Sequence, residues 1–441
     1  MIHLANILIV TDDAGLSQEL TRKLEQQRYE VRVTDSQADA LAEAARDHPD
    51  IILLGDTFKG GDPTTFTRIL KGSAATYDIA ICLVNLVPTA EIQTRALAAG
   101  MSDVLTPPLT DTKLIARLRP LLRLQSMQIE LQQRGIAARP FDTALPPFAA
   151  PARRKTDNED RILLIGGDVK ELARHLPEAS VSMVENPYVA EDELENQNYD
   201  AAIAVANDQP DAYLDLCTQS RNNPRLFNLP LILIADPAQI DEETAYQHGV
   251  SGYFAEPADP FQLNNAAMFL VRRQRMRWAV REALTEAALP AIKDPATGVF
   301  SRDYFDSYLP IRVAYAHKLN RPLSIAFFRV PDVEAVRQRF GDEQANHLRL
   351  QVSQWITGLL RVEDMTARFE ENEFCVVLPD SPQNEASLVI NRIAGVLAYT
   401  DFAVRDVYEP VKVWVRIGSA ELEEGESGEH LVARARQQMA D

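Results

Sequence analysis

Residues 7–13 read ILIVTDD and residues 161–168 read RILLIGGD, and each opens the same succession of segments. The first is followed by VRVTDS, PDIILLG, IAICLVN and GMSDVLTPP, and the second by VSMVEN, YDAAIAV, LPLILIADP and GVSGYFAEP. Short apolar runs separated by helical patterns predict β-α-β units around a parallel sheet. Strands that are apolar throughout suit a sheet covered by helices on both faces. The sequence therefore predicts one doubly wound, flavodoxin-like α/β fold that is used twice.

The length and the breaks in this pattern predict how the chain divides. At roughly 150 residues per domain, 441 residues correspond to about three domains. We expect a first domain over 1–134, a Pro-rich linker over 135–159, a second copy with a long exit helix over 160–290, and a mixed α/β third domain over 291–441. In the third domain the apolar runs predict strands at 323–330, 373–379 and 411–420.

Composition and charge limit the classes of function. The chain has 45 Lys and Arg against 64 Asp and Glu, and 45 − 64 gives a net charge of −19. Such a chain is repelled by nucleic acid phosphates and anionic lipids, so we expect neither nucleic acid binding nor membrane insertion. Cys82, Cys217 and Cys375 are an odd number of cysteines, which fits a reducing cytoplasm. No run approaches 18 apolar residues, and the first residues lack the basic and apolar regions of a signal peptide.

The doubled unit resembles the receiver domain of two-component response regulators over residues 5–125 and 160–275. That resemblance implies an acidic pair for Mg²⁺ after the first strand, an Asp phosphoacceptor after the third, a hydroxyl after the fourth and a Lys after the fifth. In the first copy these positions hold one acid, Asp12, and then Gly55, Val84 and Pro107. Asp56 follows the acceptor position by one residue, which in a strand turns the side chain to the other face.

The second copy keeps none of the receiver chemistry. Its positions hold Gly166 and Gly167, then Val205, Ala235 and Glu256. We therefore expect both units to be scaffolds without a metal site, for dimerisation or partner docking. Phosphorylation of Asp56 stays an open alternative for the first unit.

The third region resembles the GGDEF domain of diguanylate cyclases. The entry turn DPATGVFSRDYF (294–305) is similar to that of the family, and EENEF (370–374) occupies the signature. In the family, the glycines let the backbone approach the GTP phosphates, and carboxylates hold two Mg²⁺ ions. Here the glycines are Glu370 and Glu371, the signature Asp is Asn372 and the other metal Asp is Arg329, so that only Glu373 remains.

The guanine-reading positions of the family are also changed, to Arg337 and Asn346. Because the metal ligands, the phosphate cradle and the base reader are all altered, we expect no catalytic residues, no cofactor and no cyclase activity. We expect Arg329 and Arg337 to pair with the new acidic residues, Glu370 and Glu371.

One binding element of the family survives. An R-x-x-D element, five residues before the signature, is the family's inhibitory site for cyclic di-GMP, and here it is Arg361 to Asp364. A third family position, an Arg on the following helix, is Arg392. Arg can bond guanine O6 and N7 with two donors, and Asp can accept from the Watson–Crick edge of guanine. R-x-x-D alone is a weak motif, and its register against EENEF is what makes it specific.

Together these features predict a catalytically inactive cyclic di-GMP receptor. The resemblance implies polar localisation, a homodimer, and cell-cycle-regulated proteolysis through the adaptor RcdA, with CtrA and ClpXP downstream. We expect the helix at 260–289, which joins the second receiver to the third domain, to transmit ligand binding. The alternatives are a residual diguanylate cyclase, a GTP sensor and a scaffold that needs no ligand.

Overall fold

The computed structural model describes residues 5–87, 89–141, 160–167, 169–176, 179–206, 209–286, 290–405 and 408–439. The chain forms two compact units. The first, called the receiver unit after the resemblance of its sequence, contains the described residues of 5–125 and 160–279, and the C-terminal unit contains the described residues of 126–141 and 280–439. Two long helices, α5 (Asp111–Ala138) and α10 (Pro260–Glu286), contribute residues to both units.

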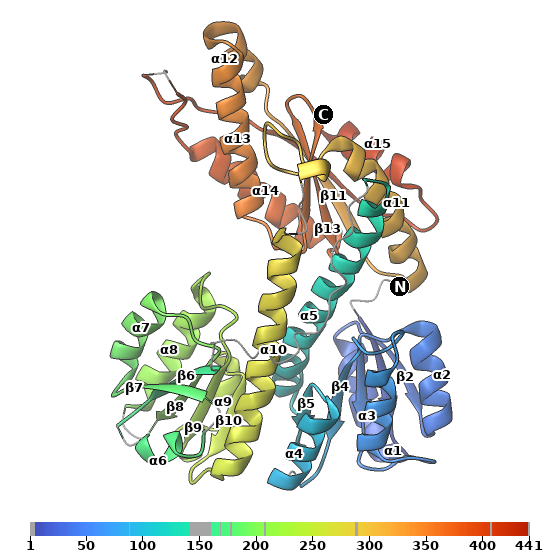
Figure 1. The fold of residues 1–441 in the computed structure, drawn as a ribbon, viewed down its shortest axis with the longest axis vertical. Helices are drawn as coiled ribbons and strands as arrows, with labels where there is room; N and C mark the ends of the chain where they lie inside the picture. Colours follow the sequence, from blue (N-terminus) through green and yellow to red (C-terminus); the bar gives the residue numbers. More distant parts are fainter. Residues whose placement is uncertain are drawn as a thin grey trace. The chain divides into compact units, whose positions relative to one another are not determined.

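The first part of the receiver unit is a five-stranded parallel sheet in the order β2-β1-β3-β4-β5 (Figure 1). The strands are β1 (Asn6–Val10), β2 (Glu30–Thr34), β3 (Ile51–Leu54), β4 (Ala80–Val84) and β5 (Asp103–Leu105). The helices are α1 (Ala14–Gln26), α2 (Gln37–Asp47), α3 (Pro63–Gly72), α4 (Ala90–Ala99) and the first half of α5. The central strands β3 and β4 are buried along their whole length because helices cover both faces of the sheet.

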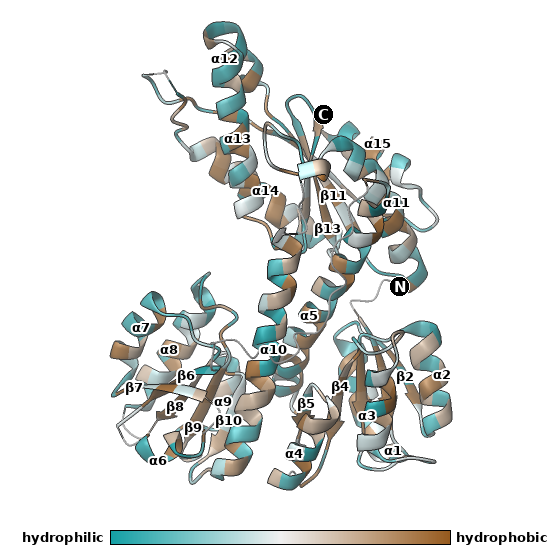
Figure 2. Ribbon diagram, viewed as in Figure 1, coloured by the Kyte–Doolittle hydropathy of each residue, from teal (hydrophilic) through white to brown (hydrophobic). Residues whose placement is uncertain are grey.

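The second part repeats this topology. Its strands are β6 (Asp160–Ile165), β7 (Ala179–Val184), β8 (Ala201–Ala206), β9 (Leu231–Ala235) and β10 (Gly252–Ala255). Their order, β10-β9-β8-β6-β7, is that of the first sheet read from the other edge, and all pairs are parallel. The helices are α6 (Lys170–Ala173), α7 (Pro187–Asn196), α8 (Pro210–Asn222), α9 (Glu242–Gln247) and α10. The predicted doubly wound parallel sheets are thus confirmed, and Figure 2 shows inner strands such as β4 and β9 as hydrophobic.

The C-terminal unit contains an antiparallel sheet in the order β12-β13-β11-β14. Its strands are β11 (Leu323–Arg329), β12 (Met365–Glu370), β13 (Glu373–Pro379) and β14 (Arg416–Glu421). Its helices are α11 (Arg302–Leu319), α12 (Asp332–Phe340), α13 (Asp342–Gly358), α14 (Gln383–Tyr399) and α15 (Gly428–Gln438). The predicted strand at 411–420 is shorter than expected, since 411–415 are not part of β14.

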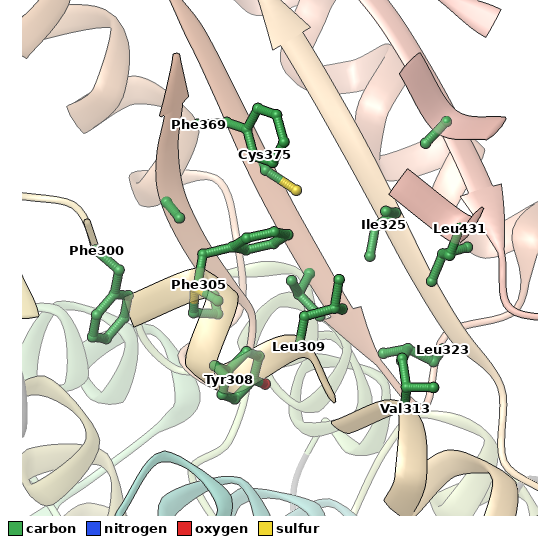
Figure 3. Packing of buried hydrophobic residues seen from close by; sticks show 14 of the residues in the cluster. Phe300, Phe305, Tyr308, Leu309, Val313, Leu323, Ile325, Phe369, Cys375 and Leu431 are labelled. Atoms are coloured by element: carbon green, nitrogen blue, oxygen red, sulfur yellow. The ribbon is translucent and has the colours of Figure 1, made fainter. Parts of the chain in front are cut away.

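Alternation along β11 gives this sheet two apolar faces. Ile325 and Phe327 belong to a core with residues of α11 and α15, whereas Ala326 and Phe328 belong to a second core with residues of α12, α13 and α14. Figure 3 shows the first core, in which Phe305 and other side chains of α11 pack toward the strands. The sheet therefore lies between two layers of helices.

The predicted linker at 135–159 begins later than expected. Helix α5 continues to Ala138, and residues 139–141 form a 3-10 helix. Ala137 and Ala138 are fully buried in the α11 core, so tertiary packing extends the helix past Arg134. The rest of the predicted linker lies outside the described residues.

The three cysteines are buried free thiols. Burial raises the pKa of Cys82, Cys217 and Cys375. Among the described residues, no helix combines the length and the apolar character needed to cross a membrane.

Candidate functional site

The R-x-x-D element forms a closed turn between α13 and β12. The backbone N–H of Asp364 donates to the carbonyl of Arg361 at 3.1 Å, and the backbone N–H of Arg361 donates to Asp364 Oδ2 at 2.8 Å. The Arg361 side chain is exposed, whereas Asp364 Oδ1 is buried and has no hydrogen-bond partner among the described residues. The turn therefore holds a carboxylate with unused acceptor capacity next to an exposed guanidinium.

The third predicted ligand residue lies at the same edge of the unit. Arg392, exposed on α14, donates from its guanidinium to the carbonyl of Leu359 at 2.9 Å. Leu359 is two residues before Arg361, so α14 places Arg392 against the start of the turn. The three residues singled out from the sequence are thus brought together by one turn and one helix.

The electrostatics of the turn are unusual for an aspartate. Burial raises the pKa of Asp364 to about 7, and the neighbouring Glu363 adds to the effect. The amide and guanidinium of Arg361 and the guanidinium of Arg134 act in the opposite direction without overcoming it. A donor that reached this carboxylate would find an acceptor that the protein itself leaves poorly solvated.

Arg134, near the end of α5, contacts the turn but was not among the site residues predicted from the sequence. Its guanidinium donates to three consecutive carbonyls of the turn, those of Val362, Glu363 and Asp364, at 3.3, 3.1 and 3.0 Å. The helical pattern indicated that Arg134 belongs to a helix, but no local signal identifies a partner that is 228 residues away in the chain.

The signature residues Glu370 to Glu373 form the tip of the β12–β13 hairpin, and internal ion pairs fill the space around it. Arg329 donates to Glu373 Oε2 at 3.0 and 2.7 Å, and Arg436 contacts Glu373 Oε1 at 2.8 Å. The Glu373 side chain is 1% exposed and is covered by these two guanidinium groups. Of the metal carboxylates expected in a cyclase, one position therefore holds Arg329, which pairs with the carboxylate that remains, Glu373.

The guanine-reading positions of a cyclase are occupied in the same way. Arg337 donates to Glu371 Oε1 at 3.2 Å, and Arg349 donates to Asn372 Oδ1 at 3.2 Å and to Asn346. The predicted pairing with the new acidic residues is confirmed for Arg337, which contacts Glu371, whereas Arg329 pairs with Glu373, the signature Glu that the sequence retains.

At the carboxyl end of the first parallel sheet, the acidic side chains are already engaged. Asp13 caps α1 by accepting from the backbone N–H groups of Gly15 and Leu16. Asp12 Oδ1 accepts from the Thr57 hydroxyl at 2.5 Å, and Asp56 accepts from Asn85. Within the described part of the chain, no three His, Cys, Asp or Glu side chains are grouped to hold a metal ion.

The phosphoacceptor position itself has no room for a side chain. A β-carbon built on Gly55 would lie 2.4 Å from Thr11 Oγ1. In the second sheet, Gly166 has a φ of 144°, and a β-carbon there would lie 3.0 Å from the carbonyl oxygen of Val205. A side chain at Gly55 or Gly166 would therefore meet a neighbour, whereas Gly167 has open space.

The two parallel-sheet domains contact each other within the receiver unit. Lys113 of α5 pairs with Glu242 of α9 at 2.9 Å, and the Thr110 hydroxyl donates to Glu243 at 2.6 Å. Asn265 of α10 donates to the carbonyl of Ala90 at 3.0 Å. This face of the first domain, formed by α4 and α5, is used for contact inside the chain.

Comparison with known proteins defines the class of this chain. Residues 7–119 match the family described as response regulator receiver domain, and residues 291–441 match diguanylate cyclase, GGDEF domain. The protein thus combines a receiver domain and a GGDEF domain.

Among individual proteins, the chain is similar to the response regulator PleD of Caulobacter vibrioides, with 28% identity over 439 residues, 98% of this chain and 95% of PleD. The phosphate regulon regulator PhoB of Klebsiella pneumoniae is 28% identical over 30% of this chain and 60% of PhoB. A solved structure of the GGDEF domain of DgcB from Caulobacter crescentus in complex with c-di-GMP matches with 20% identity, 34% of this chain, 87% of that chain and a TM-score of 0.34.

Proposed function

We propose that the protein is a catalytically inactive receptor for cyclic di-GMP, a PopA-like relative of PleD that binds the dinucleotide at Arg361, Asp364 and Arg392. The observation that carries the proposal is the closed R-x-x-D turn, in which an exposed guanidinium lies next to a buried carboxylate oxygen that has no hydrogen-bond partner in the described part of the chain. Charge-assisted hydrogen bonds to such groups contribute roughly 1.5–3 kcal/mol each. Two or three of them, with stacking, support micromolar or tighter binding.

The chemistry of the site suits guanine. The guanidinium groups of Arg361 and Arg392 can donate to O6 and N7 of a guanine or to a phosphate. The Asp364 carboxylate can accept from the N1 and N2 hydrogens of guanine, a pattern that adenine does not offer. The site therefore favours a guanine-containing dinucleotide over its adenine counterpart.

The β12–β13 hairpin, which carries the signature residues, supports the proposal that the protein is catalytically inactive. Two Mg²⁺ ions would have to displace Arg329 from Glu373 and then rest on that single carboxylate. A GTP triphosphate would meet Glu370 and Glu371, whose charges repel it. The same argument opposes a GTP sensor.

The output that we propose rests on resemblance. Ligand binding would expose a docking surface for RcdA at the cell pole, with CtrA and ClpXP downstream, in a homodimer. Cells that carry Arg361→Gly should lose polar recruitment of these partners, and unchanged recruitment would contradict this output.

Calorimetric titration of the full chain with cyclic di-GMP tests the binding step. Wild type should bind, and Arg361→Ala should lose binding at least tenfold. Arg405→Ala is the matched control, because Arg405 is an exposed arginine of the same unit whose side chain pairs with Glu343. GTP with Mg²⁺ should give neither binding heat nor product. If wild type does not bind cyclic di-GMP, the receptor proposal fails and the scaffold alternative stands.

A further inference from the structure

A buried polar cluster joins α5 to α11 in the C-terminal unit. Glu130 and Arg134 of α5 are 1% and 3% exposed, and Tyr308 and Arg312 of α11 are 0% and 1% exposed. Arg134 Nε donates to Glu130 Oε1 at 2.7 Å, and the Tyr308 hydroxyl donates to both oxygens of Glu130 at 2.7 and 2.9 Å. Arg312 adds a second guanidinium at 3.9 Å from Glu130 Oε2.

Burying such a cluster in a core costs free energy. Removing charges from water costs several kcal/mol per ion, and apolar residues of similar volume often replace a buried ion pair without loss of stability. Here two guanidinium groups contact Glu130, and one of them, Arg312, also lies 3.9 Å from Asp380. Packing of α5 alone does not require this arrangement.

The guanidinium of Arg134 also contacts the R-x-x-D turn. While Nε is held by Glu130, the NH2 group reaches the carbonyls of Val362, Glu363 and Asp364. The helix backbone is anchored as well, because the Tyr304 hydroxyl donates to the carbonyl of Arg134 at 3.1 Å. All three contacts come from one nitrogen of a rigid planar group, so they favour the conformation of the turn in which the three carbonyls point to that nitrogen.

We infer that Arg134 is a positioning residue that fixes the R-x-x-D turn in its binding conformation and couples occupancy of the turn to the packing of α5. This inference rests on the proposed function, and it assigns the coupling to α5 rather than to the helix at 260–289 that the sequence suggested. The coupling is reciprocal: a ligand that holds the turn stabilises the packed α5, and a packed α5 favours the ligand. Because α5 begins at Asp111 in the first parallel-sheet domain, it is a continuous covalent connection from that domain to the site.

The test compares two conservative variants of the same cluster in the full chain. Arg134→Lys keeps the positive charge but cannot donate to Glu130 and to three carbonyls together. Tyr308→Phe removes a buried hydroxyl from Glu130 and leaves the contacts to the turn in place. We expect Arg134→Lys to weaken cyclic di-GMP binding at least tenfold in calorimetry and Tyr308→Phe to change it by less than twofold. Equal losses in the two variants would mean a merely structural role and overturn the inference.

A second measurement needs no ligand. Hydrogen exchange of the backbone amide of Asp364, which is bonded to the Arg361 carbonyl, should be at least tenfold faster in Arg134→Lys than in Tyr308→Phe. Unchanged exchange would overturn the inference even if both variants still bound ligand. If wild type fails to bind cyclic di-GMP, the proposed function fails separately, and the exchange result still decides whether Arg134 positions the turn.

Discussion

Replacing Asp364 by Asn should stabilise the C-terminal unit while it removes ligand binding. The pKa of Asp364 is raised from 3.8 to about 7, chiefly by burial. Between these values the folded state carries a proton on Asp364 that the unfolded state has lost, so raising the pH favours unfolding. A shift of about three pKa units corresponds to at most about 4 kcal/mol of lost stability above pH 7. Asn is neutral at every pH and can still accept from the amide of Arg361.

The measurement is the free energy of unfolding of wild type and Asp364→Asn in urea at pH 5, 6, 7 and 8. Two of the three tryptophans, Trp355 and Trp414, lie in the C-terminal unit, so fluorescence reports mainly on it. The difference between variant and wild type should grow by about 2 kcal/mol from pH 5 to pH 7, at up to about 1.4 kcal/mol per pH unit. Taking this difference cancels groups that both chains share.

Asp380→Asn is the matched control. Burial acts to raise the pKa of Asp380, but Arg321 and Arg312 outweigh it and hold the pKa below its usual range. The stability from this carboxylate is present above pH 4 and is lost only at lower pH, so its difference from wild type should stay constant from pH 5 to 8. A constant difference for Asp364→Asn as well would refute the assignment of a poorly solvated carboxylate to the turn.

Three further outcomes follow from the same geometry. Because the ionised Asp364 is the acceptor for guanine, cyclic di-GMP affinity measured by calorimetry should fall about tenfold from pH 8 to pH 6, and a flat profile would argue against that role. Arg329→Asp places a second carboxylate beside the buried Glu373, so urea unfolding should show a loss of about 1–3 kcal/mol, and chromatography should still detect no cyclic di-GMP made from GTP and Mg²⁺. Gly55→Asp should lower the free energy of unfolding of the receiver unit by about 1–3 kcal/mol because its β-carbon meets Thr11. Acetyl phosphate should leave the variant unphosphorylated.

Sequence patterns predicted the parts of this molecule that depend on local order. The apolar runs at 7–10 and 51–54 form buried parallel strands, as predicted, because a run without polar alternation needs cover on both faces. The position of Arg361 and Asp364 relative to the signature also follows from local order, because the turn is followed directly by β12, which ends at the signature.

Features that depend on contacts between residues far apart in the sequence were not predicted. The extension of α5 to Ala138 results from burial against α11, and the contacts of Arg134 join residues more than 200 positions apart. Neither leaves a periodic trace, because a helical pattern reports which face is apolar and not which carbonyls a long polar side chain will reach. The same limit explains why 411–415 resembled a strand, since an alternating pattern does not say whether a partner strand is available.

The burial of all three native thiols has a practical consequence for spectroscopy. Cys82, Cys217 and Cys375 are each at most 1% exposed and carry raised pKa values, so little thiolate is present at neutral pH to react with a maleimide or a methanethiosulfonate. A cysteine introduced at an exposed position in each unit would therefore be the main point of labelling, without a cysteine-free background. Pairs of dyes or spin labels attached in this way can report the distance between the receiver and C-terminal units with and without dinucleotide in an otherwise native chain.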